Sequence, residues 1–501
     1  MTLTVMQSGR TRSMTGVKMS FLPLTAAPID YFQQLFPDRL FADIRDETIR
    51  YARQKGDATF DTSVAELKAY MGILFLMGVI GLPNYRCYWS SRKELRQPVI
   101  ADVMSRNRYE MLTKYFHLND NTTQRPRGSP EHDKLHKVRP MIDHAKRVFC
   151  QHYAPHQNIA VDEAMIKFKG RCSFLQYIPS KPCKWGIKAW ALADSESFYL
   201  VNFDVYVGKD GADGNARNNI PLGTRVVTKL VEPYYKKRHH VYFDNYFTSV
   251  KLVESLARKK TYATGTVRKE RRGLPVPMKS LKMKQSGEMR KWQKGRMMAV
   301  SWQEKKRQVN VLTSRNVTGN MELRRPGKRG QPEQRYLKPI TIQDYTENFN
   351  GVDKSDQLRQ YYGIANKANK WWKYLFWFLC DVKMVNAYIL YKEAPGGPRP
   401  KPNTHLQFHL EVATALVAGF TSRKRRASGD APEAAVIKTP TVHESTKITT
   451  TRGIRNCVLC PREGRFTAAG NKIQSSFECV KCGVALCKDR GCFAAFHHYQ
   501  Q

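Results

Sequence analysis

The chain has 501 residues, of which 41% are apolar, and a formal net charge of +41. This length predicts about three or four domains, and a charge of this size repels itself unless a polyanion such as nucleic acid neutralises it. A ribosomal or chromatin-associated scaffold has the same composition and stays open as an alternative. The longest apolar run, residues 69–83, is shorter than the roughly 20 residues that a bilayer requires, so we expect no membrane span.

The chain opens with a basic stretch and continues with helical patterns. Residues 1–27 contain no acid and no continuous apolar run, which predicts a disordered basic arm and no signal peptide; a transit peptide is an alternative interpretation. Apolar residues then recur at spacings of three and four, which is typical of amphipathic helices. These patterns predict helices over residues 64–80, with Asp61-Thr62-Ser63 before it, 105–116 and 134–149.

From about residue 158 the pattern changes to strands that alternate with helices. Runs rich in β-branched and aromatic residues predict strands at 159–161, 187–191, 199–207 and 241–243. Between and after them, helices are expected at 223–231 and 249–260. This order of elements is typical of an α/β core.

The next segments are strongly basic or strongly apolar. Residues 268–307 carry 14 Lys and Arg against three Glu, with Trp292 and Trp302 among them, which predicts a basic β-rich insertion that either contacts nucleic acid or is a solvated face. Residues 369–392 predict a buried helix and residues 404–420 one more. The basic block that opens the polar linker at 422–455 fits a nuclear-localisation signal, so we expect the nucleus.

Three acids stand at the ends of expected elements. Asp162 and Asp244 each follow a strand-like apolar run, and Asp353 lies near Asp356 at an expected helix start. Singly, each is a strand-end or helix-cap residue. Together, they would repel one another unless they shared a cation, and hard carboxylate oxygens suit Mg²⁺. Two such ions about 3.5–4 Å apart promote phosphoryl transfer, so the sequence predicts that chemistry on a nucleic acid.

The stretches around these acids resemble the piggyBac family of DNA transposases, and their order and spacing agree with that family from about residue 30 to the C-terminus. The motifs that carry the resemblance are Val161-Asp162-Glu163, Phe168-Lys169-Gly170-Arg171-Cys172, Tyr177-Ile178-Pro179-Ser180-Lys181-Pro182, Asp244-Asn245-Tyr246-Phe247-Thr248-Ser249, Gly265-Thr266-Val267-Arg268 and Gly351-Val352-Asp353-Lys354-Ser355-Asp356-Gln357.

The resemblance implies a multidomain α+β protein with an RNase H-like α/β catalytic core. It implies a DDE/D transposase that moves a DNA element by cut-and-paste excision and integration at TTAA sites, through hairpinned ends. The implied cofactor is Mg²⁺, with two ions at the active site and Mn²⁺ as a substitute. The implied partners are double-stranded DNA, as element terminal repeats and TTAA target, and a second copy in a homodimer, with no small-molecule substrate.

By the same resemblance, Asp162, Asp244 and Asp353 are the metal-binding catalytic triad, and Asp356 is a fourth acid near the site. The residues that the motifs place against DNA are Lys169, Arg171, Tyr177, Lys184, Asn245, Arg268 and Trp371. Burial in the helical core is a competing interpretation for Trp371. A domesticated, catalytically inactive DNA-binding or chromatin protein with the same fold is the alternative function, and a nuclease of the same class is a third.

Six of the 11 cysteines fall near the C-terminus, which predicts metal binding in a reducing compartment. Two pairs with two-residue spacing allow both thiolates of a pair to reach one tetrahedral Zn²⁺. The eight expected ligands are Cys457, Cys460, Cys479, Cys482, Cys487, Cys492, His497 and His498. They suffice for two zinc sites, interleaved as in RING- or PHD-like domains, with Asp489 as an alternative to one histidine. The resemblance implies that this domain binds element-end DNA; protein binding is the alternative.

These observations predict eight segments along the chain. They are a disordered basic arm (1–27), the first part of a helical dimerisation and DNA-binding domain (28–157), the first part of the catalytic core (158–267), the basic β-rich insertion (268–335), the last part of the core (336–360), the second part of the helical domain (361–421), a basic disordered linker (422–455) and the cysteine-rich zinc domain (456–501).

Overall fold

The protein is described here by a computed structural model. It describes residues 22, 26–179, 181, 183–208, 220–315, 317–325, 334–364, 366–394, 404–421, 445–448, 453–479, 482 and 484–498. The expected basic arm apart from residues 22, 26 and 27, the basic block at 422–428 and two motif residues, Ser180 and Pro182, lie outside the described residues. The chain divides into two compact units, residues 1–424 and 425–501, and each is described by itself. Within the described part, no helix is both long enough and apolar enough for a membrane span.

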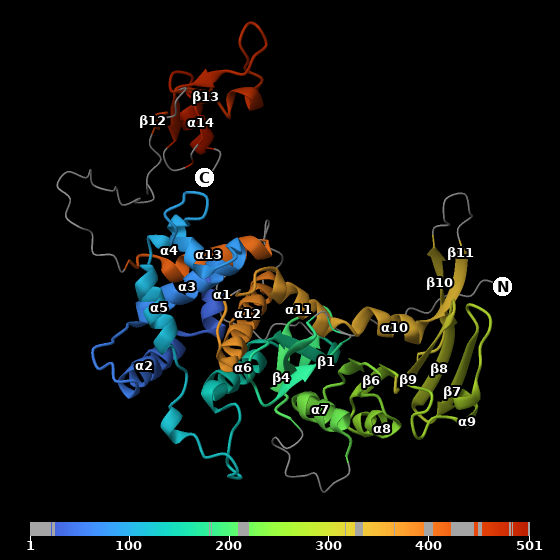
Figure 1. Cartoon of the computed structure of the whole chain (residues 1–501). Helices are drawn as coiled ribbons and strands as arrows, with labels where there is room; N and C mark the ends of the chain where they lie inside the picture. Colours follow the sequence, from blue (N-terminus) through green and yellow to red (C-terminus); the bar gives the residue numbers. More distant parts are fainter. Residues whose placement is uncertain are drawn as a thin grey trace. The chain divides into compact units, whose positions relative to one another are not determined.

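Helices from both ends of the first unit pack together (Figure 1). They are α1 (Pro28–Leu35), α2 (Asp38–Gln54), α3 (Val64–Ile80), α4 (Pro98–Ala101), α5 (Arg106–Tyr115), α6 (Arg139–His152), α12 (Trp371–Lys392) and α13 (His405–Val417), with short 3-10 turns at Tyr85–Trp89, Asn121–Thr123 and His136–Val138. Helix α3 begins where the Ser63 hydroxyl accepts from the Glu66 N–H, and it ends at Gly81 in the left-handed conformation.

The three expected N-terminal helices are present, and one begins later than predicted. The helix expected over 134–149 begins with the 3-10 turn, and α6 follows with Pro140 in its first turn. Proline has no N–H to donate, so it is tolerated in the first turn of a helix and not in the middle. Helix α12 is buried almost along its whole length, as its apolar sequence predicts.

A nine-stranded sheet forms the rest of the first unit, in the order β2-β3-β1-β5-β6-β9-β8-β7, with β4 also paired to β3. The strands are β1 (Asn158–Lys167), β2 (Leu175–Tyr177), β3 (Trp185–Asp194), β4 (Leu200–Val205), β5 (His240–Phe243), β6 (Tyr262–Thr266), β7 (Met289–Lys294), β8 (Met297–Glu304) and β9 (Arg307–Thr313). Strands β1, β5 and β6 run parallel to one another, and β3 runs antiparallel to β1.

Helices cover both faces of this sheet (Figure 1). On one face, α7 (Leu222–Val231) packs on β3 and β4, and α8 (Val250–Arg258) packs on β6. On the other, α10 (Ile340–Asn348) and α11 (Gly351–Tyr361) pack on β1. The sheet therefore buries both faces at β1, which explains the apolar runs that precede the acids.

The expected insertion is rich in strands, and its first three strands extend the core sheet. Strand β9 pairs with β6 from Thr264↔Thr313 to Thr266↔Val311, so β7, β8 and β9 continue the sheet outward. A short helix, α9 (Val276–Ser280), precedes them. The second part of the insertion is a separate hairpin of β10 (Asn320–Arg325) and β11 (Gln334–Pro339).

The second unit is small and has little regular structure. It holds β12 (Ser445–Lys447) paired with β15 (Phe477–Cys479), β13 (Arg455–Asn456) paired with β14 (Gln474–Ser475), a 3-10 turn at Cys460–Glu463 and α14 (Cys492–His498). Its core consists mainly of cysteines with a few aliphatic side chains such as Leu459, Ile473 and Leu486. So small an apolar core needs a cross-link or a metal for stability.

Candidate active site and metal centre

Asp162 and Asp244 are neighbours on adjacent parallel strands. Val161 pairs with Phe243 in the register of β1 and β5, and each acid follows its paired residue directly. Adjacent strands lie about 4.8 Å apart, and side chains alternate between faces, so the two acids project from the same face of the sheet. It is the face on which α10 and α11 pack.

The Asp162 carboxylate is largely buried, with 19% of its side chain exposed. Burial raises its pKa to about 7, against the opposing effect of the Lys181 charge. Burial also raises the pKa of Asp244, although that carboxylate accepts a hydrogen bond from the Tyr246 N–H at 2.9 Å. Both acids are thus desolvated more than their hydrogen bonds and neighbouring cations compensate.

Asp353 comes to the same place from the first turn of α11. That helix approaches β1 closely through Gly351, where a Cβ atom would lie 3.0 Å from the Asp194 carbonyl oxygen and 3.2 Å from the Ala160 Cβ. A Cβ atom two positions before the acid would thus be crowded, which favours glycine there. The Lys181 Nζ atom lies 3.6 Å from the Asp162 carboxylate and 3.5 Å from that of Asp353, and joins the two.

The three aspartates meet in one region without forming a tight cluster. In the described part of the chain, the only groups of three or more metal-ligating side chains with ligand atoms within 4.8 Å of one another are two groups of cysteines, one of which includes a histidine. Carboxylates without a shared cation repel one another, and here the ammonium of Lys181 lies between two of them. Hard oxygens whose burial is poorly compensated fit a divalent cation, so we regard the donor set as suited to Mg²⁺ or Mn²⁺.

Asp356, expected as a fourth acid, is held by a cation of its own. Its carboxylate accepts from Arg359 at 3.2 Å on the same helix. Burial raises its pKa, while Arg359 and Lys181 both lower it. Asp356 therefore lies close enough to Lys181 and Asp353 for their charges to affect its pKa, and its carboxylate already forms an ion pair with Arg359.

Most of the residues expected at DNA lie on the surface of the first unit. Lys169, Arg171, Lys184 and Arg268 are exposed. Tyr177 is 51% exposed, and its ring lies 4.7 Å from that of the exposed Trp185. The half-buried Asn245 accepts a hydrogen bond from the Arg268 Nε at 3.1 Å. The exposed Tyr177 and Trp185 rings are suited to stacking on DNA bases, and the exposed cations are suited to phosphate contacts.

Trp371 is partly buried in the helical region and also lines a basic cavity. Its ring is half-buried and packs edge-on against Phe174, with the centroids 5.1 Å apart. It also lines a cavity of about 570 Å³ whose other walls carry many cations. The polar and charged residues that line this cavity include Gln124, Arg125, Arg127, His132, Lys134 and Lys137.

Sequence reasoning missed two residues of the site, Lys181 and Lys188. Lys181 was part of a motif but had no assigned role, and its contact with two acids depends on the fold. Lys188 lies 3.6 Å from the Glu163 carboxylate and 3.7 Å from the ring centroid of Trp190, and burial lowers its pKa. The position of Lys188 in an apolar strand was the one available signal, because a lysine there needs a partner.

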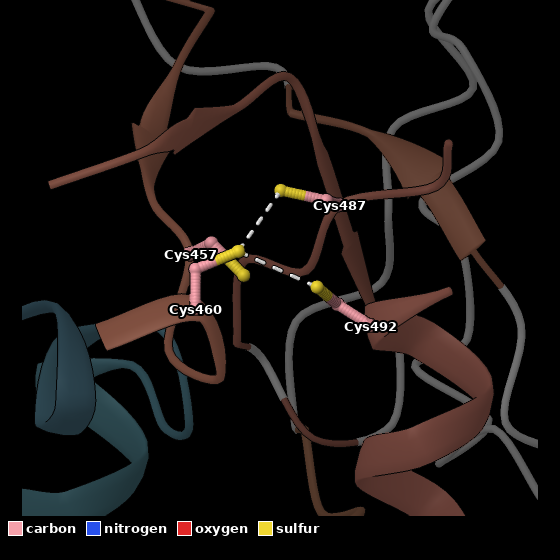
Figure 2. A group of neighbouring side chains, drawn as sticks. All are labelled: Cys457, Cys460, Cys487 and Cys492. Carbon is pink, nitrogen blue, oxygen red and sulfur yellow. Dashed lines mark hydrogen bonds between the residues drawn. The ribbon is translucent and has the colours of Figure 1, made fainter. Parts of the chain in front are cut away.

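The second unit brings its cysteines together as a four-sulfur group (Figure 2). Cys457, Cys460, Cys487 and Cys492 are all buried, and the Cys460 sulfur lies 3.8 Å from that of Cys487 and 3.5 Å from that of Cys492. Although burial acts in the opposite direction, backbone N–H groups lower the pKa of Cys457 to about 7. Four convergent thiols, one already inclined to ionise, fit a tetrahedral Zn²⁺.

A second group contains Cys479, Cys482 and His497. The His497 Nδ1 lies 2.7 Å from the Phe493 carbonyl oxygen and its Nε2 lies 3.6 Å from the Cys482 sulfur. With Nδ1–H donating to the carbonyl, Nε2 is left as a metal ligand. In chain order, the first, second, fifth and sixth of the expected ligands form one group, and the third, fourth and seventh form the other. The two groups are therefore interleaved along the chain. The side chain of His498 lies outside the described residues, and Asp489 belongs to neither group.

Comparisons with known proteins agree over most of the chain. Residues 27–388 match the family model described as Transposase IS4. Human PiggyBac transposable element-derived protein 2 is 28% identical over 375 residues, which cover 73% of this chain and 62% of that protein. Human PiggyBac transposable element-derived protein 3 is 25% identical over 475 residues, which cover 93% of this chain and 76% of that protein.

The fold is also similar to a solved one. The structure of a piggyBac transposase synaptic complex with hairpin DNA superposes with a TM-score of 0.71 and 23% identity, covering 96% of this chain and 98% of that one. This chain spans about 62% of the length of the first human relative, so their similarity concerns the shared part. Since the family model covers well over half of the sequence, the chain belongs to the piggyBac-type branch of the Transposase IS4 family.

Proposed function

We propose that this chain is a DDE/D DNA transposase that excises and integrates a DNA element at TTAA sites through hairpinned ends. The observation that carries the proposal is the delivery of Asp162, Asp244 and Asp353 to one face of the sheet, where two of them share Lys181. Family membership and a net charge of +41 support it. A protein so basic has a polyanion as its natural partner.

The strand order supports an RNase H-like core. Strands β4, β3 and β1 form an antiparallel series, and β5 and β6 then continue parallel to β1. In this arrangement the first acid lies within β1, the second at the end of the adjacent β5 and the third on a helix packed across β1. The three acids thus come from three separate elements.

The chain's own residues then have distinct roles. Asp162 and Asp244 hold the divalent cations from the sheet, and Asp353 closes the site from α11. The bound Mg²⁺ or Mn²⁺ supplies Lewis-acid stabilisation to the attacking and leaving oxygens of phosphoryl transfer. Lys181, once the carboxylates are neutralised, is available to a DNA phosphate. Lys169, Arg171, Lys184 and Arg268 hold the backbone, and Tyr177 stacks on a base.

The remaining expectations belong to the same proposal. Two copies act on two element ends, the protein works in the nucleus, and the second unit binds two Zn²⁺ ions and element-end DNA. The solved relative is described as a synaptic complex with hairpin DNA, which supports hairpinned ends here. Cys457, Cys460, Cys487 and Cys492 form the first zinc site, and Cys479, Cys482 and His497 belong to the second.

A plasmid excision assay with candidate element ends tests the proposal, with the repaired junction read by sequencing. We expect seamless restoration of TTAA by the unmodified chain. Asp162→Asn, Asp244→Asn and Asp353→Asn should each lower excision by about a thousandfold, because metal catalysis contributes several kcal/mol. Unchanged excision in these variants would refute the catalytic assignment.

A domesticated, catalytically inactive DNA-binding protein is the second candidate. The human relatives are described as transposable element-derived proteins, and Lys181 already neutralises part of the acid centre. In this case the chain binds element-end DNA in a gel-shift assay but yields no excised junction, and the aspartate variants bind as well as the unmodified chain. Cleavage without joining would instead indicate a nuclease.

A further inference from the structure

A continuous row of hydrogen bonds crosses the sheet beside the acids. The Asp344 carboxylate on α10 lies 2.9 Å from the Tyr242 hydroxyl, which lies 2.8 Å from the His240 Nδ1. The His240 Nε2 lies 2.7 Å from the Thr264 hydroxyl, and this in turn lies 2.7 Å from the Thr313 hydroxyl. The row therefore joins α10 to β5, β6 and β9, and its Tyr242, His240, Thr264 and Thr313 side chains are buried.

One direction of donation satisfies the whole row. Burial, with the nearby Arg315 charge, lowers the pKa of His240 well below its usual value, so the ring is neutral. The Tyr242 hydroxyl donates to the Asp344 carboxylate, and its oxygen then accepts from His240 Nδ1–H. The His240 Nε2 accepts from Thr264, whose oxygen accepts from Thr313. Hydrogen bonds that all point toward one carboxylate polarise and strengthen one another.

The row lies on the face of the sheet that carries the acids. Tyr242 pairs with Ala160, two residues before Asp244 and Asp162 respectively, so all these side chains share one face. At the other end, α10 is followed almost directly by α11, which carries Asp353. The bond between Tyr242 and Asp344 thus connects the strand that ends at the second acid with the helical segment that leads to the third.

We propose that Tyr242 and Asp344 are positioning residues that set the distance between Asp244 and Asp353, and thereby the affinity of the acid centre for divalent cations. The inference rests on the proposed function, since it concerns the same centre. Neither residue touches the substrate or the ion. Their effect passes through β5 and through the α10–α11 segment, in the way that outer hydrogen bonds orient metal ligands.

A second hydrogen bond ties the end of α10 to the sheet, apart from that of the Tyr242 hydroxyl. The Ser195 hydroxyl donates to the Asn348 carbonyl oxygen at 2.6 Å, so the end of α10 is also tied to the turn after β3. With Gly351 packed against Ala160, the start of α11 is therefore fixed to β1 and β3. The hydrogen bond from Tyr242 to Asp344 adds a direct tie between this segment and β5, beside the longer contact of 3.4 Å between the Thr266 and Tyr345 hydroxyls. Loss of the Tyr242 hydroxyl should leave the fold intact and alter one spacing.

Binding of Mn²⁺ to the full-length protein tests this inference, with the free ion followed by electron paramagnetic resonance. Mn²⁺ prefers oxygen ligands to the thiolates of the second unit. We expect Tyr242→Phe to weaken the site that is lost in Asp162→Asn by about tenfold, as found for hydrogen-bond partners of metal ligands. Asp344→Ala should behave in the same way, and Asp344→Asn, which keeps an acceptor for Tyr242, should restore most of the affinity.

Tyr85→Phe is the matched control. The Tyr85 hydroxyl also donates to a carboxylate, that of Glu110, at the same 2.9 Å, but it lies among the helices. Its loss should lower thermal stability by no more than the loss of the buried Tyr242 hydroxyl, and it should leave the Mn²⁺ affinity unchanged. Equal Mn²⁺ affinity in Tyr242→Phe and the unmodified chain would overturn the inference while leaving the proposed function intact. If the unmodified chain shows no site that depends on Asp162, both fail.

Discussion

The two candidate metal-binding regions of this protein differ in how closely their ligand side chains are gathered. In the second unit four cysteine sulfurs gather within 4.8 Å, buried in a core that consists largely of the ligands themselves. In the first unit the three aspartates stand on separate elements, and Lys181 lies between two of them. Neutral thiols pack together at little cost, whereas carboxylates repel.

Under the proposed function, the difference corresponds to two uses of a metal. The cysteine groups form much of the core of a small unit, so zinc bound there would be structural. The acid centre belongs to a large sheet whose fold is secured by apolar packing, so a cation bound there would serve chemistry. The expected structural ligands are already converged, while the expected catalytic ligands stand on separate elements.

Zinc removal should give the largest effect. Chelation, or Cys460→Ser, should unfold the second unit, because structural zinc contributes about 10–16 kcal/mol in small zinc domains. Zinc content measured by atomic spectroscopy should fall, and limited proteolysis should cut within residues 453–498 while leaving the first unit intact. A second unit that resists proteolysis without zinc would contradict the structural role.

The sequence predicted the cysteine region better than the acid centre. The spacing of Cys457 and Cys460 on a short turn allows both sulfurs to meet one ion, so the ligands could be read from local spacing. Asp162 and Asp244 were found because each follows a buried run, and Asp353 through its motif at an expected helix start. Lys181 was not assigned a role, since its place between two acids depends on a turn between β2 and β3 and on the packing of α11. The extension of the sheet by β9 also escaped, because strand pairing at an edge leaves no local pattern.

The second largest effect should be a pH dependence of the stability of the first unit, which arises from a buried pair of His156 and Asp194. His156 donates to the buried Asp194 carboxylate, their side chains lying 2.9 Å apart. That hydrogen bond outweighs burial and raises the pKa of His156 to about 9, whereas the pKa of Asp194 falls below its usual value despite burial, because of His156 and backbone N–H groups.

The raised pKa of His156 and the lowered pKa of Asp194 determine how stability changes with pH. A raised histidine pKa stabilises the fold fully below pH 6.5, and this is lost as the pH rises toward 9; the contribution of Asp194 is lost as the pH falls below about 4. Unfolding of the first unit by denaturant should thus become easier by up to about 3 kcal/mol between pH 6.5 and 9. His156→Gln should flatten this slope, and an equally steep slope in that variant would exclude the pair as its cause.

Replacing Lys181 should raise the affinity of the acid centre for a divalent cation. In Lys181→Met the ammonium no longer competes for the Asp162 and Asp353 oxygens, so Mn²⁺ affinity should rise severalfold, or by about 1 kcal/mol. The same variant should bind element-end DNA more weakly in a gel shift at low salt. Lower or unchanged Mn²⁺ affinity would mean that Lys181 does not compete with the cation.

The central claim, that the three aspartates form one metal-dependent centre for DNA strand transfer, is tested most directly by the products of purified protein on element-end DNA with Mg²⁺. A denaturing gel should show a hairpinned element end for the unmodified chain and none for Asp162→Asn, Asp244→Asn or Asp353→Asn. Hairpins formed equally by those variants, or no hairpin from the unmodified chain with its matching element ends, would contradict the account.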